Sequence, residues 1–205
     1  MNLPTFLKLA AIIGSVSISI FLYRIIKNIL VTIFGFILPI NPKKYGGDWV
    51  LITGATDGIG KEYAKNFAKK GMNVFLVSRN IKKLNSTADE LRTLSKKFNQ
   101  NVKTHVLAID FSSKTDEIYE VLRAEVSKTG FEIGILVNNV GIGYPGPAII
   151  TEIENGENVV NDLCNVNMRA QVKVSRAILP QMVERKNGLV INISSLSGII
   201  NVPYS

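Results

Sequence analysis

A short apolar run that leads through a glycine-rich turn into a helical pattern is the feature that most restricts the fold of this chain. Val50, Leu51 and Ile52 form the β-rich run, residues 53–60 form the turn, and Lys61 opens the helical pattern. A parallel strand needs a crossover, usually helical, before the next strand can pair beside it. Strand, glycine turn and helix in this order therefore indicate an α/β fold.

The chain after Trp49 repeats this alternation. The β-rich runs are residues 49–53, 73–77, 104–109, 134–138 and 189–193. The helical patterns between them are residues 61–70, 81–98, 114–128 and about 158–184. Such alternation predicts a parallel sheet covered on both faces, and right-handed crossovers make it a Rossmann-type, doubly wound sheet. We expect residues 43–205 to form this domain.

The first 42 residues are expected to form a membrane anchor and linker. Residues 9–23 and 29–40 carry no charge, and Arg24 and Lys27 stand between them. Two arrangements are open. In the first, residues 6–23 cross a membrane and the second run lies in or against its interface. In the second, one longer tilted helix crosses the membrane, and the side chains of Arg24 and Lys27 extend to the membrane–water interface. A cleaved secretory signal fits less well, because the apolar material is too long.

Charge and cysteine content narrow the classes of function. The net charge of +8 comes from lysines that are spread along the chain, which favours a membrane surface or an anionic cofactor over nucleic acid. Lys43 and Lys44 add to the positive charge after the first apolar run and predict a cytosolic domain. With one histidine, His105, and one cysteine, Cys164, a zinc site is excluded. We expect Cys164 to be buried and His105 to be a strand residue.

The turn itself has the chemistry of a phosphate site. It reads T-G-A-T-D-G-I-G from Thr53 to Gly60, and it is not a P-loop, which needs Lys and Ser or Thr after the last glycine. Gly54 permits a sharp turn, Gly58 lets the backbone approach a phosphate, and the following helix presents free amides. We predict that the pyrophosphate of a nicotinamide dinucleotide binds here. The predicted contacts are Gly54, Thr56, Asp57, Gly58, Ile59 and Gly60.

The end of the second strand predicts which nicotinamide cofactor is bound. An NAD-specific protein of this fold places an acidic residue there for the ribose hydroxyls, whereas this chain has Arg79. A guanidinium pairs bidentately with a 2′-phosphate, so NADPH is preferred over NADH. A solvated arginine at a strand end is the alternative.

Three further motifs, in order, complete a resemblance to the short-chain dehydrogenase/reductase family. Residues 138–141 read N-N-V-G and are similar to the family's N-N-A-G motif, Asn167 is similar to its catalytic asparagine, and Ser195 to its catalytic serine. The resemblance implies that Ser195 bonds the substrate carbonyl and that Asn167 supports a water relay for the proton. The further cofactor contacts that it implies are Asn139, Val140, Gly141 and the adenine-contacting Asp110. Asp110 is explained nearly as well as a cap of the next helix.

The family's proton-donor tyrosine and its lysine lie further from the serine than this chain extends. Tyr204 follows Ser195 too closely for that role, so we expect it to line the substrate pocket. The resemblance therefore implies part of a longer enzyme, with a sheet that is incomplete at its C-terminal end.

The apolar N-terminus, with Asp57, Lys61 and Val140 in the motifs, resembles the membrane-bound subgroup of 17β-hydroxysteroid dehydrogenases and very-long-chain 3-oxoacyl-CoA reductases. This implies an endoplasmic reticulum enzyme that reduces a ketone on an acyl-CoA or a steroid with NADPH, its domain facing the cytosol. Residues 142–150 are expected beside the pocket, and a homo- or heterodimer is possible. A catalytically inactive, membrane-tethered nucleotide binder or heterodimerising fragment is the alternative. The coding sequence after Ser205 distinguishes the two.

Overall fold

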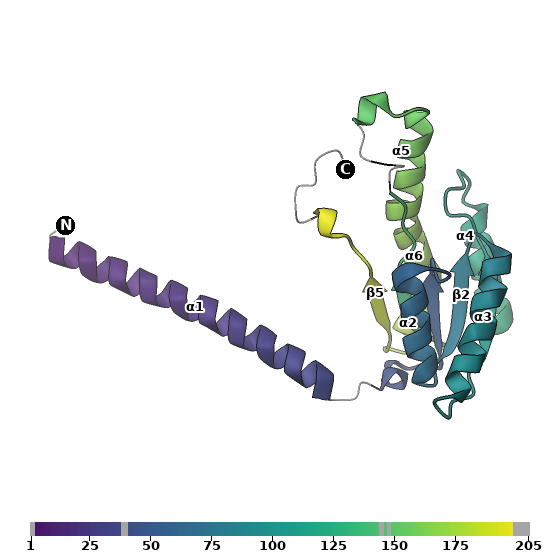
Figure 1. Cartoon of the computed structure of the whole chain (residues 1–205), viewed down its shortest axis with the longest axis horizontal. Coiled ribbons are helices and arrows are strands. Elements are labelled where there is room, and N and C mark those ends of the chain that lie inside the picture. The colour runs from purple at the N-terminus through teal and green to yellow at the C-terminus, as the bar shows by residue number, and fades with distance from the viewer. Residues whose placement is uncertain (1–2, 38–40, 144–145, 147–148, 199–205) are drawn as a thin grey trace. The chain divides into compact units, whose positions relative to one another are not determined.

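The computed structural model describes residues 3–37, 41–143, 146 and 149–198 (Figure 1). The chain divides into two compact units, Met1–Asn41 and Pro42–Ser205. Tyr204, expected in the substrate pocket, lies outside the described residues, as do Pro145 and Pro147 of the expected pocket loop.

The first unit is a single helix, α1 (Leu3–Ile37), that continues through Arg24 and Lys27. Within the described residues it is the one helix that is long and apolar enough to cross a membrane, over Pro4–Gly35. Its 35 residues reach about 50 Å at the usual helical rise, more than the roughly 30 Å of a bilayer core. One continuous helix is the geometry that the longer, tilted arrangement requires.

The second unit contains the strands expected from the sequence, each within one residue of its expected bounds. They are β1 (Trp49–Thr53), β2 (Asn73–Ser78), β3 (Thr104–Ala108), β4 (Ile133–Asn138) and β5 (Leu189–Asn192). All pairs are parallel and the order is β3-β2-β1-β4-β5. Because the order reverses at β1, the sheet is doubly wound, which confirms the predicted Rossmann-type fold.

Helices cover both faces of this sheet (Figure 1). They are α2 (Gly58–Lys69), α3 (Ile81–Lys96), α4 (Glu117–Thr129), α5 (Gly156–Cys164) and α6 (Ala170–Glu184). Short helical segments are η1 (Pro42–Tyr45), η2 (Ile150–Glu152) and η4 (Leu196–Gly198). The helix expected over about 158–184 contains a π-helical segment, η3 (Asn165–Arg169), between α5 and α6.

The core forms two layers because successive side chains of a strand point to opposite faces. In β1, Val50 and Ile52 pack toward α2 and α3, whereas Trp49 and Leu51 pack toward α4 and α6. All four are buried. A strand that is buried on both faces reads as a continuous apolar run, which is why β1 is easy to find in the sequence.

The one histidine and the one cysteine of the chain were both given expected locations, and only the first is confirmed. His105 lies in β3, as expected, and its Nε2 atom is 2.9 Å from Oε1 of Glu125. The expectation of a buried Cys164 is wrong, because its side chain is exposed at the end of α5. No residue of α5 is buried, so the apolar residues of this helix do not mark core positions.

The turn after β1 packs closely against the loop after β4. Gly54 has a φ of +65°, in the left-handed region, and a Cβ at this position would lie 2.9 Å from Nδ2 of Asn139. A Cβ on Gly60 would lie 2.4 Å from the same atom and 2.5 Å from the carbonyl oxygen of Gly54. Both glycines are therefore needed for this contact.

We expect Gly60→Ala to lower the free energy of unfolding of the second unit by about 1–3 kcal/mol, because the new methyl group overpacks a backbone contact. Gly143→Ala is the matched control, since a Cβ there meets nothing within 4 Å, and it should change stability by less than about 0.5 kcal/mol. Urea unfolding in detergent can be followed by the fluorescence of Trp49, the only tryptophan. Equal stabilities of the two variants would contradict the close packing.

Candidate cofactor site

A cavity of about 560 Å³ opens at the carboxyl ends of the strands. Loops after β1, β2, β3 and β4 contribute to it, which is the position where open α/β sheets bind their ligands. Nine of the predicted cofactor contacts line it: Gly54, Thr56, Asp57, Gly58, Arg79, Asp110, Asn139, Val140 and Gly141. The sequence motifs therefore come together in one place, although they are spread over almost ninety residues.

The N-terminus of α2 points amides toward the turn. Asp57 caps the helix, and its Oδ1 atom accepts a hydrogen bond from the Gly58 amide at 2.8 Å. Among the described residues, the amides of Ile59 and Gly60 have no acceptor. Unpaired amides at the positive end of a helix form an anion site.

A set of hydrogen bonds holds the turn against the loop that follows β4. The buried Thr53 hydroxyl accepts the amides of Asn139 and Val140 at 3.0 and 3.1 Å. In return, the side-chain amide of Asn139 donates to the carbonyl oxygens of Thr53 and Gly54 at 3.0 and 3.2 Å. These four hydrogen bonds thus join the turn after β1 to the loop after β4.

The β2–α3 connection forms another part of the cavity. Ser78 ends β2, and its hydroxyl lies 3.1 Å from that of Thr56 in the glycine turn. The exposed Arg79 follows, and Asn80 then caps α3 by accepting the amide of Lys83 at 3.0 Å. Arg79 forms no ion pair with any carboxylate in the described part of the chain.

Asp110 does not cap the next helix. Its Oδ1 atom accepts bonds from the amide and the hydroxyl of Ser112, at 3.1 and 2.9 Å, whereas the N-terminal residue of α4 is preceded by Asp116. The alternative explanation of Asp110 as a helix cap is therefore wrong. The carboxylate stabilises a local turn and faces the cavity.

Asn167 clamps a loop rather than lining the cavity. Its Oδ1 atom accepts the Ile142 amide at 2.8 Å, and its Nδ2 atom donates to the Ile142 carbonyl at 2.9 Å. Ile142 itself lines the cavity. Asn167 sits within η3, and π-helical segments of this kind occur frequently at functional sites.

Ser195, Ile59 and Gly60 are predicted site residues that do not line this cavity. Gly60 is buried under the turn, Ile59 is 58% exposed, and Ser195 follows β5 with an exposed side chain. The cavity also has lining residues that were not among the predicted contacts: Ser78, Asn80, Lys83, Ile109, Phe111, Ser112, Asp162 and Val166, besides Ile142 of the loop expected beside the pocket. Most of them directly follow a strand end or open a helix, which is the signal that could have found them.

An ion-pair network fixes the angle between the two helices that carry the turn and Arg79. Lys61 of α2 lies 2.7 Å from Glu90 of α3, and Lys65 lies 3.3 Å from the same carboxylate. The hydrogen bond from Lys61 holds the pKa of Glu90 below its usual value, and the bonds to Glu62 and Glu90 raise that of Lys65. The Lys61 side chain is thus paired with Glu90 of α3, and Lys61 does not line the cavity.

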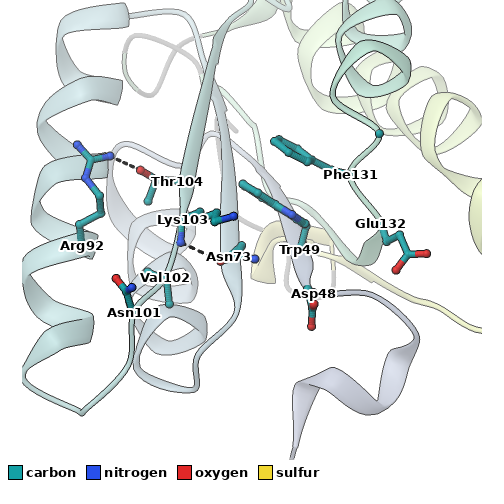
Figure 2. Close-up of a pocket in the computed structure, with 11 residues that line it drawn as sticks. Asp48, Trp49, Asn73, Arg92, Asn101, Val102, Lys103, Thr104, Phe131 and Glu132 are labelled. Atoms are coloured by element: carbon teal, nitrogen blue, oxygen red, sulfur yellow. Dashed lines mark hydrogen bonds between the residues drawn. The ribbon is translucent and has the colours of Figure 1, made fainter.

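A larger hollow, of about 800 Å³, opens at the amino ends of the strands (Figure 2). Trp49 stacks on Phe131 with ring centroids 3.7 Å apart. Arg92 is bound to Thr104 and Asp89, and the Asn73 side chain accepts the Lys103 amide at 2.8 Å. No described helix N-terminus lines the hollow, and the Arg92 guanidinium is already bound, so we do not assign an anion site to it.

The cavity at the carboxyl ends fits a dinucleotide. Gly58 faces it with a φ of +49° and open space where a Cβ would stand, so a phosphate can reach the backbone. The free amides of Ile59 and Gly60 lie in the same helical turn. The cavity is also lined by the hydroxyls of Thr56 and Ser78, the side-chain amide of Asn80 and the guanidinium of Arg79. Its volume is within the usual range for small-molecule sites.

Comparison with known proteins agrees with this geometry. The family model for short chain dehydrogenases matches residues 48–205. Very-long-chain 3-oxoacyl-CoA reductase from Mus musculus is 45% identical over 157 residues, which cover 77% of this chain and 47% of the relative. The chain therefore spans about half the length of the curated relatives that it matches.

Solved structures share the fold. L-Sorbose reductase from Gluconobacter frateurii, complexed with NADPH and L-sorbose, superimposes with a TM-score of 0.67 at 28% identity over 79% of this chain and 58% of that one. A 3-oxoacyl-[acyl-carrier protein] reductase from Brucella melitensis with bound NAD gives 0.65 at 29% identity over 80% and 59%. Since the family match begins at Asp48 and contains the glycine turn, the N-N-V-G motif, Asn167 and Ser195, the chain belongs to the short-chain dehydrogenase family.

Proposed function

We propose that this chain binds NADPH in the cavity at the carboxyl ends of its strands and serves in the reduction of a ketone on a lipid substrate. The observation that carries the proposal is the joint placement of the glycine turn and Arg79 on one cavity, with no acidic residue at the end of β2. Bound there, the reduced nicotinamide supplies the hydride.

The cofactor preference follows from the position of Arg79. In this proposal the α2 amides and Gly58 bind the pyrophosphate, and the adenosine ribose lies beside β2. Arg79 follows β2 and can pair with a 2′-phosphate, whereas a carboxylate there would repel it. Asn139, Val140 and Gly141 line the cavity from the β4 side and are proposed contacts for the rest of the dinucleotide.

The substrate class is proposed from the relatives. The mouse relative is named for a very-long-chain 3-oxoacyl-CoA, and a 17-ketosteroid is the other candidate from the sequence resemblance. In this proposal Ser195 bonds the substrate carbonyl and stabilises the developing oxyanion, and Asn167 keeps the loop around Ile142 in place while it supports proton delivery.

We also propose that α1 anchors the protein in the endoplasmic reticulum membrane with the second unit on the cytosolic side. Three hydroxyl side chains of α1 suit this role, because Ser15, Ser17 and Thr32 donate back to carbonyls of their own helix at 2.8–2.9 Å. A hydroxyl that is satisfied within its own helix can lie in lipid. The anchor suits substrates that partition into the bilayer.

The cofactor assignment predicts a clear preference in binding titrations. The 205-residue chain in detergent should bind NADPH at least about tenfold more tightly than NADH, because one charge-assisted pair to the 2′-phosphate contributes about 1.5–3 kcal/mol. Arg79→Ala should remove most of this preference and leave NADH binding unchanged. Arg176→Ala, on α6 away from the cavity, is the control. Equal affinities for the two cofactors in the unchanged protein would contradict NADPH specificity.

The proposed reaction is tested by NADPH oxidation with a long-chain 3-oxoacyl-CoA and, separately, with a 17-ketosteroid. We expect no turnover from residues 1–205 by themselves, and clear turnover from an extended chain that also supplies the family's proton-donor tyrosine and lysine. In the extended chain Ser195→Ala should lower kcat by about a hundredfold or more, and Ser194→Ala should not. Cofactor binding without turnover in the extended chain would favour the inactive nucleotide-binding alternative.

The anchor predicts resistance to alkaline carbonate extraction. The expressed chain should stay in the membrane pellet, and Ile18→Asp combined with Phe21→Asp should shift it to the supernatant, because charges at the centre of a spanning helix cost about 2.5–3.5 kcal/mol each. Ile81→Asp, at an exposed position in the second unit, is the control.

Protease added outside sealed microsomes should digest the second unit, and a protected second unit would reverse the proposed orientation.

A further inference from the structure

We propose that Lys83 is a second cation for the 2′-phosphate of the cofactor, so that the NADPH preference depends on two arms. One arm is Arg79 after β2, and the other is Lys83 in the first turn of α3. This inference rests on the proposed NADPH site and adds a specificity-determining residue to it.

The geometry of the β2–α3 connection supports this role. Arg79 and Lys83 both line the cavity, although they belong to a loop and a helix. Asn80 lies between them and fixes the helix start: its side chain accepts the Lys83 amide and its carbonyl accepts the Leu84 amide, both at 3.0 Å. The backbone of Lys83 is therefore held in place, and its flexible side chain is the part that can adjust to a ligand.

Both cations are available for an anion. Across the described ranges, neither Arg79 nor Lys83 is within 4 Å of a carboxylate, whereas Lys61 and Lys65 are paired with Glu90. The first amides of α3, those of Ile81 and Lys82, also have no acceptor there. These free amides lie at the N-terminal, positive end of the sixteen-residue helix α3, which favours an anion there.

The charge balance of the cavity favours a second cation beside Arg79. Three carboxylates line it, from Asp57, Asp110 and Asp162, and the only cations among its lining residues are Arg79 and Lys83. A phosphate monoester brings a further charge of about −1.5 to −2 near neutral pH. With Arg79 alone, the carboxylates would outnumber the cations three to one among the described lining residues, so Lys83 makes the phosphate end of the cavity more attractive to an anion.

Lys82 provides a matched comparison. It lies in the same turn of α3 and is also exposed, but it does not line the cavity. A general effect of positive charge would be shared by both lysines, whereas a specific contact with the phosphate belongs to Lys83.

The test compares ligands that differ by the 2′-phosphate alone: 2′,5′-ADP with 5′-ADP, and NADPH with NADH. In the 205-residue chain, Lys83→Ala should weaken 2′,5′-ADP and NADPH about tenfold and leave 5′-ADP and NADH within about twofold, as expected for loss of one charge-assisted contact. Lys83→Arg should keep most of the affinity, and Lys82→Ala should match the unchanged protein. The preference should also weaken with added salt.

Two results would overturn the inference. If Lys83→Ala behaves like Lys82→Ala while Arg79→Ala removes the preference, Arg79 acts alone. If Lys83→Ala weakens all four ligands equally, Lys83 supports the helix start and does not read the phosphate. Failure of the NADPH site itself is distinguishable, because the unchanged protein would then bind 2′,5′-ADP and 5′-ADP equally.

Discussion

The hydrogen bonds between Thr53 and Asn139 are the interaction on which the rest of the site depends. They join the ends of β1 and β4, the two strands on either side of the reversal in sheet order. Gly54 and Gly60 make the bonds possible because any side chain there would occupy the space of the Asn139 amide. The phosphate turn and the N-N-V-G loop are therefore one structural unit, and disturbing either displaces both. A buried threonine hydroxyl and a half-buried asparagine amide that bond to backbone groups are more restrictive than apolar contacts, since an unpaired partner would be costly.

A second layer of contacts positions the helices that surround this unit. Lys61 and Lys65 hold α2 against α3 through Glu90, and Asp116 at the start of α4 binds Arg169 and Lys173 at 2.8 Å each. The hydrogen bond from Lys173 holds the pKa of Asp116 below its usual value, so this carboxylate stays ionised at neutral pH. Both networks lie near the surface, where each pair contributes little to stability. Their effect is on orientation: they fix where the helix ends stand relative to the sheet.

The sequence predicted the fold well because its strongest signals are local. Buried strands such as β1 read as apolar runs, and helix caps such as Asn80 stand where a strand signal ends. The features that it missed depend on residues that meet only after folding. Nothing in the local pattern joins Asn167 to Ile142, or places Lys83 rather than Lys82 on the cavity. The expectation that Cys164 is buried is wrong because no residue of α5, the helix that it ends, is buried. The π-helical segment was also missed, since one extra residue within a long helix barely changes its apolar spacing.

The π-helical segment η3 has a consequence for how this region can vary. Figure 1 shows α5 and α6 as one nearly continuous column, yet five residues between them follow a wider turn than the rest. Removing a single residue there would return the segment to regular α-helical geometry and change which side chains of the segment face the Ile142 loop. The buried face of α6, which carries Val174 and Ile178, would stay where it is, while Asn167 would turn away from the Ile142 backbone. An insertion or deletion at this point would thus leave the sheet and its helices intact and disconnect the loop beside the cavity. Length between Cys164 and Ala170 is therefore as constrained as the identity of any residue in the site.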